Sequence, residues 1–153
     1  MKKNRTRGFT LIEMLVVLSI GAILLFMVSG AFSKATYREA LDKQTAIIIS
    51  LLEQARSQTL STKDDQSYGV HFEATKAVIF SGTTYSASAP SNVVELVNPL
   101  VRISTITLAG GVSDILFQRL TGETSQSGTI TLSLAASSTQ TKTITVFATG
   151  LTQ

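Results

Sequence analysis

Apolar and polar positions change their spacing twice along this chain of 153 residues. Residues 9–32 form one apolar run in which Glu13 is the only charged side chain. Over residues 34–60 the apolar positions recur every three or four residues, which is the period of one helix face. After the polar residues 61–66 the period becomes two, which is typical of half-buried antiparallel strands. The pattern therefore predicts an α+β fold in which one long helix over residues 9–61 precedes a β-rich part.

The second half of this helix, residues 33–61, is amphipathic. Its apolar face is formed by Tyr37, Ala40, Leu41, Gln44, Ile47, Ile48, Leu51, Leu52 and Ala55. Its polar side is formed mainly by Arg38, Asp42, Thr45, Glu53, Arg56 and Ser57. Glu39 and Lys43 stand in the favourable i,i+4 order for an ion pair on the helix surface. Because the apolar face needs cover, we expect residues 33–61 to pack on one or two antiparallel β-sheets and to fold together with residues 62–153.

The β-rich head, residues 62–153, holds several stretches with a period of two. They are residues 68–73, 76–80, 93–97, 101–108, 114–119, 129–134 and 143–147. Two segments rich in Ser, Thr and Ala, residues 81–92 and 135–141, are expected to be exposed loops.

The apolar run of residues 9–32 is long enough, as a helix, to cross a hydrocarbon core of about 30 Å. Before it stands a basic leader, residues 1–8, with four of the chain's 13 basic residues and no acid. Positive charge before an apolar helix holds that end in the cytoplasm and sends the following domain outward. We therefore expect a single-pass protein of the inner membrane. Without the leader, the chain has nine basic and 10 acidic side chains. The net positive charge of the whole chain therefore comes from the leader, where it serves targeting.

Glu13 has two interpretations. A charge at the centre of a membrane helix costs about 2.5–3.5 kcal/mol, so a glutamate there is a hypothesis of function. Thr10-x-x-Glu13 also matches a capping box, and a carboxylate in the first turn faces the positive end of the helix dipole. Both interpretations stay open at this point.

Residues 7–18 read Arg-Gly-Phe-Thr-Leu-Ile-Glu-Met-Leu-Val-Val-Leu. This segment resembles the processing and methylation signal of type IV prepilins and type II secretion pseudopilins. The resemblance implies that a prepilin peptidase cuts after Gly8 and methylates the new amine of Phe9. It also implies that Glu13 pairs with the N-terminal amine of a neighbouring subunit during fibre assembly. Opposite charges attract strongly in low dielectric and a buried charge left alone is costly, so such a pair would set the register of subunits.

The rest of the chain resembles the minor pseudopilin H group, which includes the related fimbrial minor pilins. The resemblance lies in the order of a long helix, short strands, the segment Phe117-Gln-Arg-Leu-Thr-Gly122, and a last strand that ends at Gly150. It implies a minor pilin or pseudopilin, a structural subunit of a type II secretion pseudopilus or type IV pilus. The implied partners are prepilin peptidase, other pilins, an inner-membrane assembly platform and membrane lipid. Residues 9–32 would then be both the membrane anchor and the helical core of the fibre.

Three alternatives remain open. A major pilin is the first, although the chain has no cysteine for the disulfide loop that many pilins carry near the C-terminus. The second is a secreted β-rich binding domain with a conventional signal peptide, cut at the small residues 29–31. The third is a DNA-uptake minor pilin. Residues 62–153 hold five basic and six acidic side chains, which argues against DNA as a partner.

The sequence predicts no catalytic, cofactor or metal site. His71 is the single histidine of a chain without cysteine, so a zinc site or a histidine-based triad is not expected. Asp64 and Asp65 supply too few oxygens for calcium, which takes six to eight. No phosphate-binding loop or nucleophile motif is present. We therefore expect a substrate of processing enzymes and not an enzyme.

Overall fold

The computed structural model describes residues 9–61 and 63–153, with the side chains of residues 27–34 and 63 excepted. The predicted leader, residues 1–8, lies outside the described residues. The chain divides into two units, residues 1–36 and 37–153, and helix α1 (Leu11–Leu60) contributes to both. The helix predicted over residues 9–61 is therefore confirmed to within two residues at each end.

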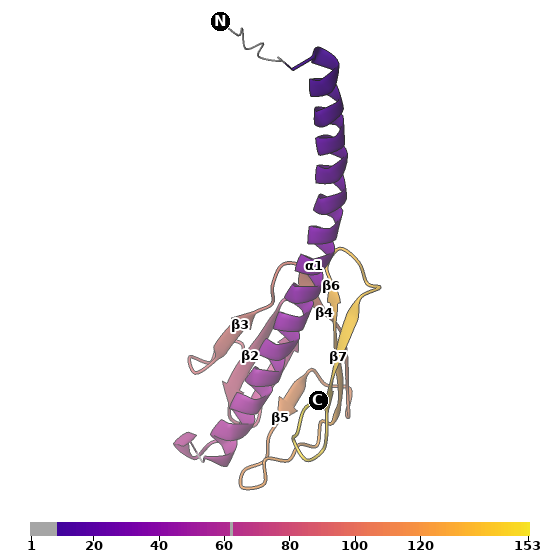
Figure 1. The fold of residues 1–153 in the computed structure, drawn as a ribbon. Coiled ribbons are helices and arrows are strands. Elements are labelled where there is room, and N and C mark those ends of the chain that lie inside the picture. The colour runs from indigo at the N-terminus through magenta and orange to yellow at the C-terminus, as the bar shows by residue number, and fades with distance from the viewer. Residues whose placement is uncertain (1–8, 62) are drawn as a thin grey trace, which may run out of the picture. The chain divides into compact units, whose positions relative to one another are not determined.

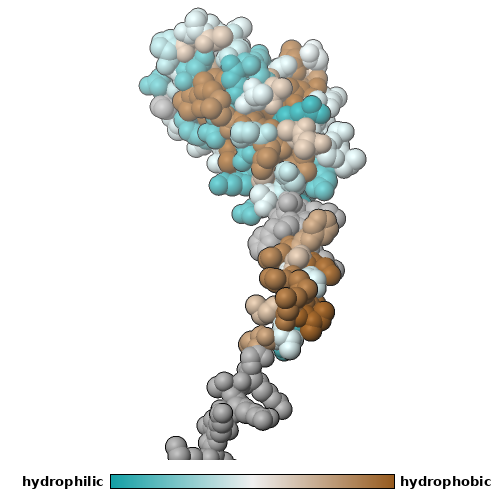
Figure 2. All heavy atoms as spheres, turned by 90° about the horizontal axis from the view of Figure 1, so that it is seen from above, coloured by the Kyte–Doolittle hydropathy of each residue, from teal (hydrophilic) through white to brown (hydrophobic). Residues whose placement is uncertain are grey.

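In the first unit, the side chains from Leu11 to Phe26 are apolar at most positions and exposed on almost every side of α1. Figure 2 shows this segment mostly in brown, the colour of hydrophobic residues. Among the residues that the structure describes, no helix is long and apolar enough to cross a membrane. The predicted span, residues 9–32, extends into residues 27–32, whose side chains lie outside the described residues.

The second unit contains two antiparallel sheets (Figure 1). The first sheet has the strand order β3-β2-β1-β5, formed by β3 (Val93–Leu96), β2 (Lys76–Ser81), β1 (Tyr68–Glu73) and β5 (Asp114–Leu116). The second has the order β4-β6-β7, formed by β4 (Val101–Leu108), β6 (Gly128–Leu134) and β7 (Thr141–Val146). A short 3-10 turn, η1 (Lys63–Asp65), joins α1 to β1. The α+β class is confirmed, with two sheets where the pattern left one or two open.

The core of this unit lies between the amphipathic half of α1 and the sheets. The buried helical residues are Ala40, Leu41, Gln44, Ile48, Leu51, Leu52, Ala55 and Thr59. All but Thr59 belong to the predicted apolar face. The largest buried side chains that the strands and their ends contribute to this core include Phe72, Phe117, Ile79, Ile115, Ile130, Leu132 and Ile144. Full burial of one such side chain contributes about 1.5–3 kcal/mol, so the helix face is an integral part of the core.

Two local expectations differ from the structure. No ion pair joins Glu39 to Lys43 among the described residues, and Asp42 instead pairs with Lys142 of β7 at 2.9 Å. The strand expected over residues 114–119 ends at Leu116, and the chain soon turns, since the Gln118 N–H donates to the Glu123 carbonyl at 2.8 Å.

The loop predicted over residues 81–92 is mostly exposed, as expected, but one of its side chains covers part of the first sheet. Tyr85 stacks on His71 with ring centroids 3.9 Å apart and meets Phe80 edge-on at 5.7 Å. The Phe80 ring lies across Gly69, where a Cβ atom would come within 2.5 Å of it. Glycine at this position thus makes room for a second small apolar layer on the face that α1 does not cover.

Candidate functional site

The described part of the N-terminal motif begins at Phe9, which precedes α1 and is exposed. Gly8 lies outside the described residues. Thr10 is the N-cap of the helix. Its hydroxyl accepts a hydrogen bond from the Glu13 N–H at 3.3 Å, and its carbonyl accepts one from the Met14 N–H at 3.2 Å.

The reciprocal half of a capping box is absent. Among the described residues, the Glu13 carboxylate forms neither a hydrogen bond to the Thr10 N–H nor an ion pair. The cap is therefore made by the threonine hydroxyl alone. Glu13 is thus an exposed carboxylate, and it is the only charged side chain of α1 between Leu11 and Phe26.

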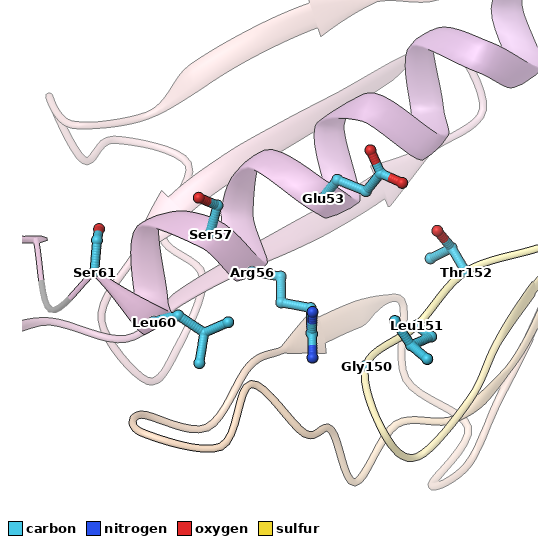
Figure 3. A pocket seen from close by; sticks show the side chains of 8 residues that line it. All are labelled: Glu53, Arg56, Ser57, Leu60, Ser61, Gly150, Leu151 and Thr152. Atoms are coloured by element: carbon cyan, nitrogen blue, oxygen red, sulfur yellow. The ribbon is translucent and has the colours of Figure 1, made fainter.

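A second site lies in the head, where Arg56 reaches from α1 to two loops (Figure 3). Its Nε donates to the Gly122 carbonyl at 3.0 Å, and its Nη2 donates to the Thr149 carbonyl at 3.4 Å. One guanidinium group thus joins the helix, the loop after β5 and the loop after β7. A planar fork with several donors suits this task in a way that a lysine ammonium does not.

The two loops meet at a pair of glycines. Gly122 and Gly150 both have positive φ angles, 66° and 76°. A Cβ atom on Gly150 would come within 1.9 Å of the Gly122 carbonyl oxygen and 2.9 Å of Arg56 Nε. Any side chain there would displace the carbonyl that Arg56 binds, so both the conformation and the close approach require glycine.

Beside this arginine runs an open groove of about 590 Å³. It is lined by Glu53, Arg56, Ser57, Leu60, Ser61, Gly150, Leu151 and Thr152 (Figure 3). The loop that Arg56 holds also carries Leu120, a leucine with a positive φ of 71° and a side chain that is 82% exposed. A strained, exposed leucine is uncommon, since most residues avoid that backbone region.

Polar contacts tie the end of α1 and the η1 turn to β1. The Thr59 hydroxyl, which is buried, donates to the Ala55 carbonyl and accepts from the Tyr68 N–H, each at 2.9 Å. The Tyr68 hydroxyl donates to Asp64 at 3.0 Å. Burial, then this hydrogen bond and the negative charge of Asp64, raise the pKa of Tyr68 above 10.0. Asp65 beside it pairs with Arg119, so both aspartates of the turn hold the fold together.

The single histidine lies in a polar cluster of the first sheet. His71 Nδ1 pairs with the Asp114 carboxylate, and Nε2 lies 3.6 Å from Glu73, which in turn pairs with Lys76 at 3.0 Å. The hydrogen bond and charge of Glu73 raise the pKa of Lys76. Among the described residues, no group of three or more His, Cys, Asp or Glu side chains is arranged to hold a metal ion.

The pattern of the sequence did not single out Arg56, which falls on the polar side of α1. Its partners are backbone carbonyls 66 and 93 residues away, so no charge pairing with another side chain reveals it. In the sequence, Gly122 and Gly150 stand only at the ends of the two segments that resemble the H group. Their close approach beside Arg56 is visible only in the fold.

A comparison with family models accounts for both parts of the chain. A model described as a prokaryotic N-terminal methylation motif matches residues 3–29. A model described as type II transport protein GspH matches residues 44–150, well over half of the chain. This chain belongs to the GspH family. It is a type IV pilin-like structural subunit. Neither a curated protein nor a solved structure matches it.

The GspH match includes Arg56, Gly150 and the two residues whose carbonyls Arg56 binds, Gly122 and Thr149. The resemblance of residues 117–122 and of the last strand to the minor pseudopilin H group is therefore confirmed at the level of the family. The methylation motif includes Gly8, Phe9 and Glu13. The GspH assignment thus depends on residues 44–150, and the N-terminal methylation motif on residues 3–29.

Proposed function

We propose that this GspH-family chain is a minor pilin or pseudopilin, made as a precursor and assembled through its N-terminal helix. Prepilin peptidase removes residues 1–8 by cutting after Gly8 and methylates the amine of Phe9. The mature subunit rests in the inner membrane through residues 9–32, with residues 33–61 and the head 62–153 outside the cytoplasm. It then enters a fibre of a type II secretion system or type IV pilus, next to other pilins and the assembly platform.

The observation that carries this proposal is the Glu13 carboxylate, which has no partner among the described residues and lies on a mainly apolar helix that Thr10 already caps. A carboxylate that is not needed as a cap is costly once the helix is covered by lipid or by other helices. The positive amine of Phe9 on a neighbouring subunit compensates that cost. Because both groups are isolated in apolar surroundings, a subunit in the wrong register leaves both charges unpaired.

The apolar surface of α1 supports the same assembly. Most side chains from Leu11 to Phe26 are exposed and apolar around the whole helix, not along one stripe. Such a helix requires an apolar environment on all sides, which a bilayer or a bundle of like helices supplies. In the head, by contrast, polar side chains alternate with buried ones along the strands, which suits a water-exposed domain.

DNA binding receives less support. Three basic side chains of the head are held by acidic neighbours: Lys76 by Glu73, Arg119 by Asp65, and Lys142 by Asp42. Phosphate binding depends on basic groups that are free to replace counterions.

The decisive experiment compares Glu13 variants of the full chain in a host with the matching assembly machinery. Intact mass gives the N-terminus, and fibre fractions give assembly. We expect a mature chain that begins with methylated Phe9. Glu13→Gln keeps the size of the side chain and removes its charge, so it is expected to insert and be processed normally but to be depleted from fibres several-fold.

Glu39→Gln serves as the matched control, because Glu39 is exposed on the same helix but lies in the second unit, and we expect normal assembly. Full incorporation of Glu13→Gln would contradict the ion pair between subunits. A mature chain that begins at Phe32 would instead favour a conventional signal peptide. Gly8→Asp is expected to leave the leader attached.

A further inference from the structure

β3 has an exposed backbone edge, because β2 is its only neighbour in the first sheet. The register of β3 on β2 shows which groups face outward. The Val97 N–H donates to the Thr75 carbonyl at 2.9 Å, so this opposed pair is hydrogen-bonded. Bonded and non-bonded pairs alternate in an antiparallel ladder. Leu96 and Val94 therefore belong to non-bonded pairs, opposite Lys76 and Val78, and their N–H and C=O groups point away from the sheet.

The side chains along this edge are also apolar and exposed. Val94 is 51% exposed and Leu96 is 71% exposed, and both lie on the face of the sheet that α1 does not cover. Between them, Glu95 projects from the opposite face, next to Ala77. It is half-buried, and among the described residues it forms no hydrogen bond or ion pair.

The other sheet edges are blocked or polar. At the far edge of the same sheet, the outward Leu116 N–H donates to the Gln126 side chain at 3.2 Å. The edge of β7 is covered by the chain's own C-terminus, where Thr145 and Gln153 exchange hydrogen bonds at 2.8 and 3.0 Å. Along β4, Arg102 and its polar neighbours are exposed. Soluble proteins usually protect apolar edges in these ways, so β3 stands out as an unprotected edge.

A second copy of this chain is a poor occupant of that edge. The register that pairs both outward residues of one β3 with both of the other places Val94 opposite Leu96 of the copy. The same register places Glu95 directly opposite Glu95 of the copy. Like charges directly opposite each other in a sheet are destabilising.

We propose that the free edge of β3 binds an extended strand of a partner protein in antiparallel register. Apolar side chains of that strand pack on Val94 and Leu96, and a lysine or arginine between them lies opposite Glu95. The backbone groups supply affinity, and the alternation of apolar and basic side chains supplies specificity. This interaction goes beyond assembly through α1 and does not depend on it.

The test uses the full chain in detergent micelles and two fluorescent peptides. Their sequences are Ser-Thr-Val-Lys-Val-Thr-Ser and Ser-Thr-Val-Glu-Val-Thr-Ser. Fluorescence anisotropy is expected to show binding of the lysine peptide about fivefold tighter than of the glutamate peptide, given the energies of cross-strand charge pairs. Amide hydrogen exchange is expected to slow at Val94 and Leu96 on binding.

Two variants sharpen the result. Glu95→Lys is expected to reverse the preference between the two peptides. Leu96→Pro removes an N–H that faces outward, which an edge strand tolerates, so binding is expected to be lost while the unfolding midpoint stays nearly unchanged. If Leu96→Pro alters the fold, the proposal is tested by Glu95→Lys alone, through the reversal of the preference between the two peptides.

Equal or absent binding of the two peptides by the unsubstituted chain would overturn the proposal, as would full binding by a folded Leu96→Pro variant. Self-association of the chain that Leu96→Pro abolishes would overturn the choice of partner, in favour of a second copy.

Discussion

At the scale of single residues, the Arg56 side chain connects three segments of the fold. It joins α1 to the carbonyls of Gly122 and Thr149 and stands beside the groove at the helix end. A hydrogen bond from a charged donor contributes more to stability than a neutral one, and an acceptor left without its donor costs still more. The packing of the Gly122 and Gly150 loops therefore depends on a group that is half-buried and has no acidic partner among the described residues.

Arg56→Lys is expected to lower the free energy of unfolding by about 1–2 kcal/mol, because lysine keeps the charge but cannot bridge both carbonyls. Pulse proteolysis of the full chain in detergent across a urea series measures the change. Arg38→Lys is the matched control, since Arg38 is exposed and has no hydrogen bond or ion pair among the described residues. Equal stability of the two variants would show that the Arg56 contacts contribute nothing.

The raised pKa of Tyr68 predicts that the folded chain loses stability at alkaline pH. Burial, and then the hydrogen bond and charge of Asp64, raise its pKa in the folded chain above 10.0, so folding favours the neutral phenol. That contribution is fully present below pH 10.0 and is lost as the pH rises through the higher folded pKa. Tyr68→Phe is expected to lack this alkaline loss. Absorbance of the phenolate follows the titration, and equal pH profiles of the two chains would contradict the assignment.

At the scale of elements, α1 is one helix with two kinds of surface. Leu11 to Phe26 is apolar all round, whereas residues 37–60 bury one face against strands and expose the other. The second surface belongs to the core of the head, and Thr59 and Arg56 fasten it at its end. The head therefore needs this half of the helix even though the strands form both sheets without it.

A chain that begins at residue 34 is expected to be a soluble, folded monomer, because it loses the apolar segment and keeps the buried helix face. A chain that begins at residue 62 loses eight buried helical side chains, including Thr59, and is expected to aggregate or stay unfolded. Circular dichroism and size-exclusion chromatography distinguish the two. A folded monomer from residue 62 onward would show that the helix is dispensable for the core.

At the scale of the whole molecule, positive charge is concentrated in residues 1–8, and the head is nearly neutral. The chain carries +3, but the leader alone holds four basic residues and no acid. In the head, several basic side chains are paired with acidic ones from other elements, as Lys142 is with Asp42. Residues 9–153 thus offer little concentrated positive charge.

The mature chain is expected to bind duplex DNA weakly at about 0.15 M salt, with a shallow dependence on salt concentration. Fluorescence anisotropy across a salt series measures both. A double variant with Asp42→Lys and Asp65→Lys frees Lys142 and Arg119, adds two positive charges and removes two negative ones, and is expected to steepen the dependence. Sub-micromolar binding by the unsubstituted chain at that salt would instead favour the DNA-uptake alternative.

Local pattern determined much of this protein. The helix extends from residue 11 to 60 where the pattern predicts 9 to 61, and β1 has the predicted bounds, because periodicity reflects the burial of one face by neighbours along the chain. The N-terminal motif is likewise readable in the sequence, since Gly8, Phe9 and Glu13 lie within six consecutive residues and need no fold to bring them together.

Only the tertiary structure decided the rest, because the partners are distant in sequence. Arg56 donates hydrogen bonds to carbonyls 66 and 93 residues away. His71 stacks on the ring of Tyr85, which belongs to a loop that composition predicts to be exposed. The unprotected edge of β3 follows from the strand order β3-β2-β1-β5. In this order β3 is an outer strand that pairs with β2 on one side only. Periodicity gives the faces of each element, but the choice of neighbours depends on how two sheets and one helix share a core.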